Sequence, residues 1–66
     1  MTRFEKDLII AKTDADELSI ILRERKAELD RLWEEGKKTK NSFRATCIAQ
    51  EYNRLAAQYE ELDQYI

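Results

Sequence analysis

The chain has 66 residues, with 12 Lys and Arg, 14 Asp and Glu, one Cys, one Gly, no His and no Pro. Its length allows one small domain, and a single cysteine without histidine excludes an intramolecular disulfide and a zinc site. The lack of histidine and of a glycine-rich phosphate loop argues against an enzyme. We therefore expect no catalytic, cofactor-binding or metal-binding residues.

Net charge and hydropathy indicate which classes of partner the chain is not suited to bind. The formal net charge of −2 provides no overall attraction to nucleic acid or to anionic lipid. The longest apolar run is the short segment from Leu8 to Ala11, so neither a signal peptide nor a transmembrane segment is expected. With the lone thiol, these features predict a cytoplasmic protein that does not bind membrane, and they argue against nucleic acid as a partner.

A first helix is predicted over about residues 3–35. Thr2 and Glu5 have the spacing of a capping box, in which each side chain binds the backbone N–H of the other residue. Gly36 is placed to adopt the left-handed conformation that often follows the last turn of a helix. These signals predict one long helix that ends immediately before Gly36.

A second capping signal lies inside this segment. Asp14 is followed three residues later by Glu17, which is also a pattern typical of a helix N-terminus. An alternative is therefore that the first turns hinge at Thr13 and a new helix begins after Asp14.

A loop is predicted at about 36–41 and a second helix at about 42–66, with Asn41 or Ser42 as its N-cap. Both helical segments carry apolar residues at alternating steps of three and four, which is the heptad pattern of a coiled-coil contact. In the first segment the seam is Phe4, Leu8, Ala11, Ala15, Leu18, Leu22, Arg25, Leu29 and Leu32. In the second segment it is Ala45, Ile48, Tyr52, Leu55, Tyr59, Leu62 and Ile66.

The two seams predict an all-α fold, a single coiled-coil-like antiparallel hairpin spanning residues 1–66. A turn at Gly36 places Leu32 opposite Ala45, and the remaining layers follow down to Ala11 opposite Ile66. The same register stacks the Arg25 guanidinium on the ring of Tyr52. Cys47 lies on a shoulder of the second helix, where we expect a small packing residue.

The predicted hairpin leaves apolar side chains without cover. In this register Phe4 and Leu8 have no opposing residue in the second helix, so the first two or three turns overhang. Further apolar side chains project from the flanks of the seam, and exposed apolar surface of this kind marks an interaction site. The candidate partner-binding residues are Phe4, Leu8, Ile9, Ile10, Ile20, Ile21 and Trp33.

The chain also resembles a known group, the small co-chaperones of type III secretion needle subunits that pair with a tetratricopeptide-repeat chaperone. The similarity comprises Met1-Thr2, the apolar stretch from Leu8 to Ala11, the block Ile20-Ile21-Leu22, and the run from Lys26 to Glu35 leading into Gly36. It continues weakly to the aromatic start of the second helix at Phe43. The second helix departs from the aliphatic, Gln-rich form of that group in having Tyr52, Tyr59 and Tyr65.

The resemblance implies a cytoplasmic co-chaperone or adaptor without enzymatic activity. Its task would be to stabilise a helical-repeat chaperone, and that pair would keep the needle subunit from polymerising early. The alternative is a homodimeric four-helix bundle that acts as a regulator, either by binding RNA or by inhibiting another protein.

Overall fold

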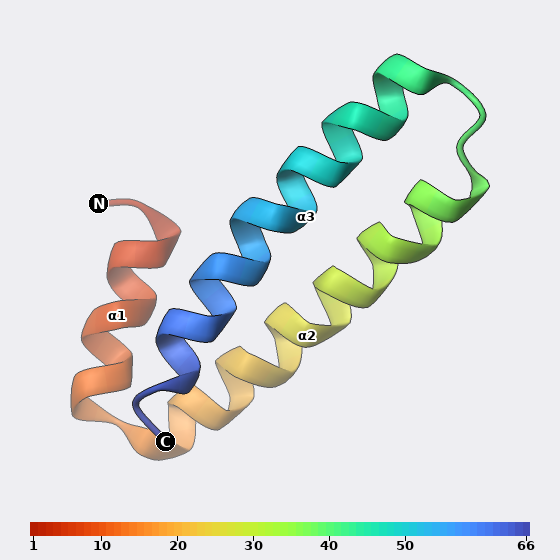
Figure 1. Cartoon of the computed structure of the whole chain (residues 1–66). Coiled ribbons are helices and arrows are strands. Elements are labelled where there is room, and N and C mark those ends of the chain that lie inside the picture. The colour runs from red at the N-terminus through yellow and green to blue at the C-terminus, as the bar shows by residue number, and fades with distance from the viewer.

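The computed structural model describes all residues from Met1 to Ile66 and contains three helices and no strand. They are α1 (Arg3–Thr13), α2 (Ala15–Lys38) and α3 (Ser42–Asp63). Helices α2 and α3 form a long antiparallel hairpin, and the short α1 folds back against one end of it (Figure 1). The prediction of an all-α chain built on a hairpin is confirmed, but the hairpin carries a third helix.

The single helix predicted over 3–35 is wrong, and the alternative hinge at Thr13 is confirmed. Asp14 has extended backbone angles of φ −146° and ψ 97°, and its side chain accepts a hydrogen bond from the Glu17 N–H. Its own N–H donates to the Ile10 carbonyl, so this residue ends α1 and begins α2. The capping box of Thr2 and Glu5 is formed as predicted, with both hydrogen bonds at 3.1 Å.

The predicted role of Gly36 as a helix terminator is also wrong. No glycine has a positive φ, and α2 continues past Gly36 to Lys38. The Thr39 N–H donates to the Glu35 carbonyl and closes the last turn. Asn41 then caps α3 by accepting a hydrogen bond from the Arg44 N–H at 3.0 Å, which confirms one of the two predicted caps.

Because α2 is longer than predicted, the two seams meet one heptad away from the expected register. An added Cβ at Gly36 would lie 3.5 Å from Ile48 Cγ2, although the prediction paired Ile48 with Leu29. Tyr52 packs on Trp33 rather than on Arg25, with ring centroids 5.7 Å apart. A heptad pattern matches itself after a shift of seven residues, so the position of the turn decides between the two registers.

The core lies where all three helices meet. Ala11, Leu18, Ile21, Leu22 and Leu62 form its buried cluster, with Phe4, Leu8, Ile10 and Tyr59 packed around it. The predicted last layers are absent, because Ala15 is exposed and Ile66 is 79% exposed. We call the end of the molecule that holds this core the base.

The opposite end of the hairpin consists of α2 and α3 alone, because α1 does not reach it. A helix of 11 residues is about 16 Å long, whereas the 24 residues of α2 extend for about 36 Å. No residue between 30 and 54 is buried, and we call this part the tip. Leu32, Ala45, Ile48 and Tyr52 of the tip are only half-buried.

Candidate protein-docking surface

A buried ion pair holds α1 on the hairpin. The Arg25 Nε of α2 donates to Asp7 Oδ2 of α1 at 2.8 Å, and Arg25 Nη1 donates to Gln58 Oε1 of α3 at 2.9 Å. The Arg25 side chain is 2% exposed, and its guanidinium carbon lies 5.9 Å from the centre of the Phe4 ring. This polar contact connects all three helices, so it fixes where α1 lies.

Four of the predicted partner-binding residues lie in the core or against it. Ile21 is buried, while Phe4, Leu8 and Ile10 pack around the buried cluster. The expectation that these side chains lack cover within the chain is corrected, because α1 folds back against the hairpin. Burial of each such side chain contributes about 1.5–3 kcal/mol, which favours the folded-back arrangement over an overhang.

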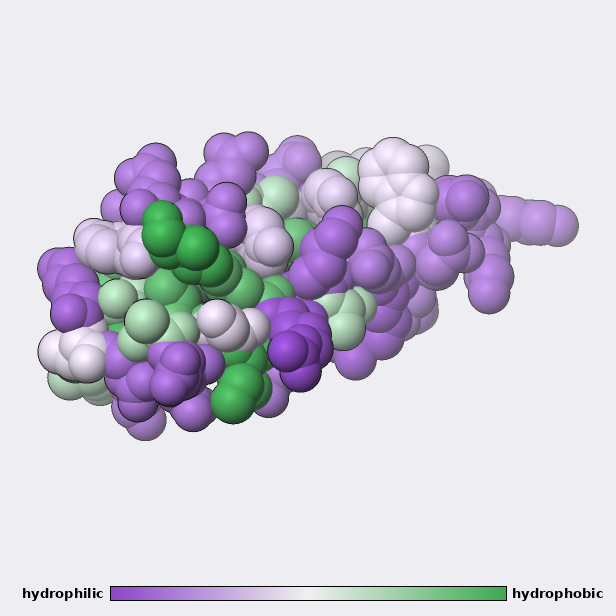
Figure 2. All heavy atoms as spheres, turned by 90° about the horizontal axis from the view of Figure 1, so that it is seen from below, coloured by the Kyte–Doolittle hydropathy of each residue, from purple (hydrophilic) through white to green (hydrophobic).

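The other three predicted residues are exposed, but they do not lie together. Ile9 is on α1, Ile20 is near the start of α2, and Trp33 is at the tip. Figure 2 shows exposed apolar atoms gathered over the base, whereas the loop end is polar. Of the three, only Trp33 borders a hollow in the surface.

The hollow beside Trp33 is a groove of about 370 Å³ between α2 and α3 in the tip. Its lining includes Leu32, Trp33 and Gly36 from α2, and Ile48, Ala49 and Tyr52 from α3. The rings of Trp33 and Tyr52 are inclined at 51° to one another, and Lys37 and Asn53 add polar atoms. Apolar, aromatic-lined concavities with a few polar groups are typical of binding sites.

The groove opens on the face of the hairpin that α1 does not occupy. Glu28 binds Arg3 of α1 at 3.0 Å, so it marks the α1 face of α2. At about 100° per residue, Trp33 lies about 140° around the helix from Glu28. On α3, Asn53 is similarly displaced from Gln58, which faces Arg25. The groove face and the α1 face are therefore separate surfaces.

A second, more polar hollow of about 330 Å³ lies beside the N-terminus of α1. Its charged side chains are already paired, since Arg3 binds Glu28 and Arg54 binds Glu51. We therefore place the candidate docking surface at the tip groove.

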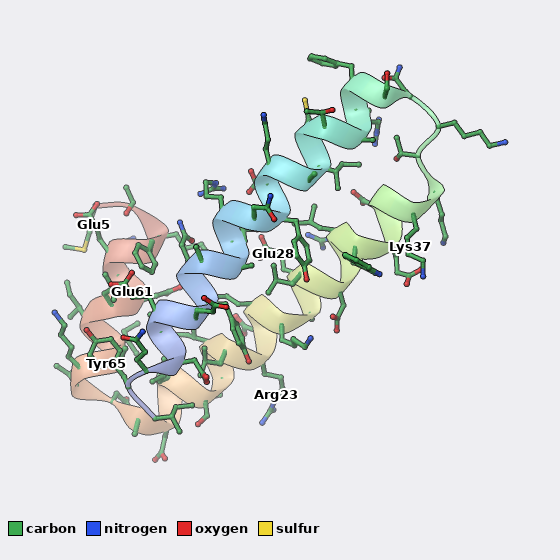
Figure 3. The ribbon with its side chains drawn as sticks, in the orientation of Figure 1. Glu5, Arg23, Glu28, Lys37, Glu61 and Tyr65 are labelled. Carbon is green, nitrogen blue, oxygen red and sulfur yellow. The ribbon has the colours of Figure 1, made fainter.

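The loop end of the tip, residues 36–50, is basic, while the rest of the chain is acidic. Gly36 to Gln50 contain Lys37, Lys38, Lys40 and Arg44 and no acidic residue. Because the chain carries −2 and this segment carries +4, the remaining residues carry −6. Figure 3 shows Lys37 near the loop, with Glu61 and Tyr65 at the opposite end. The molecule is 42 Å long, so the two charges are well separated.

Two more exposed side chains lie near the start of α3. Phe43 is 79% exposed and does not line the groove. Cys47 is an exposed free thiol, so the prediction of a packing residue there is wrong. Phe43 is thus a second exposed aromatic residue of the tip, outside the groove.

Trp33 is among the residues predicted from the sequence, whereas the other half of the groove is not. Tyr52 was assigned to Arg25, because the register was placed one heptad away. A helix that continues through Gly36 was compatible with the sequence, because a helix interior tolerates glycine at a modest cost. The three residues that follow Lys38 then suffice for the turn.

In comparisons with known proteins, the chain matches no protein-family model, no curated protein and no solved structure. None of the three helices is both long enough and apolar enough to cross a membrane.

Proposed function

We propose that this chain is a non-enzymatic protein-binding module whose tip groove accepts the apolar face of a helix from a larger helical partner. Helix-in-groove recognition needs an apolar trough with an aromatic anchor, and the groove between Trp33 and Tyr52 has this form. Because α1 folds back onto the base, no third helix covers α2 and α3 at the tip. This observation carries the proposal.

The resemblance to co-chaperones of type III secretion needle subunits supports a more specific form of the proposal. In that form the partner is a tetratricopeptide-repeat chaperone in the cytoplasm, and the module stabilises it while it holds the needle subunit. A repeat protein made of stacked helix pairs has extended grooves and exposed helix faces, which suit a short hairpin with an open apolar side.

The test uses a defined partner and two matched variants. The tagged chain is co-expressed with a tetratricopeptide-repeat chaperone of needle subunits, and the complex is recovered by affinity purification. Trp33→Asp should abolish recovery, because it places a charge in the apolar groove. Phe43→Asp changes an exposed aromatic residue of the tip outside the groove, and it should leave recovery unchanged.

Circular dichroism of both variants provides the control for folding. Trp33 is 57% exposed and Phe43 is 79% exposed, so both variants should retain the helical content of the parent chain. Equal recovery with Trp33→Asp and Phe43→Asp would contradict the assignment of the groove. If the chaperone is never recovered with the parent chain, the specific form of the proposal fails.

A further inference from the structure

We propose that the groove is covered by a second copy of this chain until a partner displaces it, in an antiparallel dimer that places the tip of each copy on the base of the other. The role of a displacing partner rests on the proposed function. The dimer itself is argued only from the surface of the chain. The two copies are related by a two-fold axis perpendicular to the hairpin, so the same surface is used twice.

The groove face continues along α3 from tip to base. Residues three or four apart lie on the same side of a helix. From the groove residues Ala49 and Tyr52, this spacing leads through Ala56 to Glu60 and Asp63. The two alanines are small, so they allow another helix to approach closely.

This face carries opposite charges at its two ends. At the tip it carries the exposed Lys37, and the exposed Lys40 lies in the loop that follows α2. At the base it carries the exposed carboxylates of Glu60 and Asp63. An antiparallel pairing brings these opposite charges together, whereas a parallel pairing brings lysine against lysine. Charge complementarity of this kind selects orientation and disfavours wrong pairings.

On α2, Arg23 lies toward the base on the same stripe as Lys37, but Asp16 lies one heptad before it and carries the opposite charge, so together they leave the charge of the base unchanged. The other charged side chains of this stripe are already paired. Lys37 Nζ lies 3.6 Å from Glu34 Oε1, and Lys26 Nζ lies 3.4 Å from Asp30 Oδ1. Both pairs are exposed, and surface pairs of this kind are worth at most about 1 kcal/mol. They can therefore rearrange toward a facing copy at little cost.

The broad face of the molecule is large enough for a specific interface between two copies. The molecule measures 42 × 20 × 17 Å, so its broad face of 42 by 20 Å covers about 840 Å². A specific interface buries about 800 Å² on each partner. Full overlap of the two faces reaches this size, while contact between the two tips alone would cover less than half of it.

Sedimentation equilibrium tests the dimer directly. The parent chain should sediment at twice its 7.9 kDa mass, and its dissociation constant should rise about tenfold or more between about 0.05 M and about 0.5 M salt, since salt screens exposed charges. A chain that remains monomeric up to about 1 mM overturns the inference.

Charge exchange tests the orientation. The tip variant Lys37→Glu with Lys40→Glu should weaken the dimer by at least about tenfold, as should the base variant Glu60→Lys with Asp63→Lys. Combining all four substitutions should restore it, because tip and base are again opposite in sign. In a parallel dimer each end faces the same end of the other copy, so none of these variants changes the like-charge contacts. Unchanged dissociation constants for the tip and base variants, or continued weakness of the combined variant, therefore overturn the antiparallel arrangement.

Two controls separate the interface from general effects. Lys6→Glu with Lys12→Glu causes the same change in net charge as the tip variant, but on α1, and it should leave the dissociation constant unchanged. Trp33→Ala should weaken the dimer by at least about tenfold, while Phe43→Ala should not. If the two alanine variants behave alike, the dimer does not use the groove.

Other occupants of the tip give different results. Binding of the parent chain to vesicles of anionic lipid, or to RNA, with no dimer detected, would assign the lysines to that ligand and overturn the inference. A failed dimer leaves the chaperone recovery experiment unaffected. Conversely, a confirmed dimer without recovery of the chaperone overturns the specific form of the proposed function and leaves the dimer in place.

Discussion

The buried ion pair between α1 and α2 leads to a quantitative prediction. Replacement of Asp7 by alanine leaves the Arg25 guanidinium buried, with Gln58 as its only remaining acceptor among the contacts in the structure. The Arg25 and Asp7 side chains are 2% and 12% exposed, so water cannot replace the lost carboxylate without moving α1. Removing one partner of a buried pair costs about 3–5 kcal/mol.

This cost is large for so short a chain. At about 0.05–0.15 kcal/mol per residue, 66 residues provide about 3–10 kcal/mol of total stability. Asp7→Ala should therefore remove a third or more of the free energy of unfolding. Urea denaturation followed by circular dichroism at low temperature measures this loss, because the parent chain and the variant can then be compared while both are folded.

A second ion pair between the same helices is the matched control. Arg3 and Glu28 also connect α1 to α2, at 3.0 Å, but their side chains are 52% and 26% exposed. Exposed pairs contribute about 0.2–1 kcal/mol, so Arg3→Ala should cost at most about 1 kcal/mol. If Asp7→Ala costs no more than Arg3→Ala, the reasoning about burial is refuted.

The apolar double variant refines the same test. One nitrogen of the Arg25 side chain, Nη2, lies 2.7 Å from Asp7 Oδ2 but makes no hydrogen bond of good geometry. The pair is therefore imperfectly satisfied, and replacing both partners by apolar residues is often neutral or stabilising. Asp7→Leu with Arg25→Met should be at least as stable as the parent chain to within about 1 kcal/mol. A loss larger than that of Asp7→Ala alone would contradict this account.

Three further predictions concern individual positions. Gly36→Ala should raise the free energy of unfolding by about 0.5–1 kcal/mol in urea titrations, since the new Cβ meets Ile48 Cγ2 at an ordinary 3.5 Å; a loss of stability would contradict the helical assignment. Leu8→Asp should lower the helical signal at physiological temperature, because it places a charge against the core; an unchanged melting curve would mean that α1 does not pack there. The hydrogen bonds from Thr2 hold the pKa of Glu5 below its usual 4.5. The stabilisation from Glu5 is therefore present above that pH and is lost as the pH falls through the lower pKa of the folded state. Glu5→Gln should flatten this part of the acid titration of stability, and an unaltered acid titration would show that the capping box does not form.

The local elements were largely predictable from the sequence. Thr2 with Glu5, Asp14 with Glu17, and Asn41 each cap a helix through the hydrogen bonds that their spacing allows. These interactions are confined to a few neighbouring residues, so they can be recognised without knowledge of the fold. What the capping pattern left open was whether the helix continues through Thr13 or breaks there. The Glu17 N–H has an acceptor in both cases, because it binds the Thr13 carbonyl in a continuous helix and the Asp14 side chain at a break.

The candidate site was less predictable than the fold, for a physical reason. Trp33 was recognised as an exposed aromatic residue, but its partner Tyr52 depends on the register of the hairpin. Phe4, Leu8 and Ile10 were recognised as apolar side chains that need cover. The sequence could not tell cover by another protein from cover by the chain itself, because both satisfy the same demand.

The sequence by itself determined that this short chain without disulfide or zinc site is helical, where its caps lie, and that its helices pair through heptad seams. The tertiary structure alone decided the register of the hairpin, the return of α1 onto the base and hence which apolar side chains stay exposed. A heptad seam packs equally well after a shift of seven residues. Only the length of α2 and the reach of Asp7 to Arg25 distinguish the arrangements.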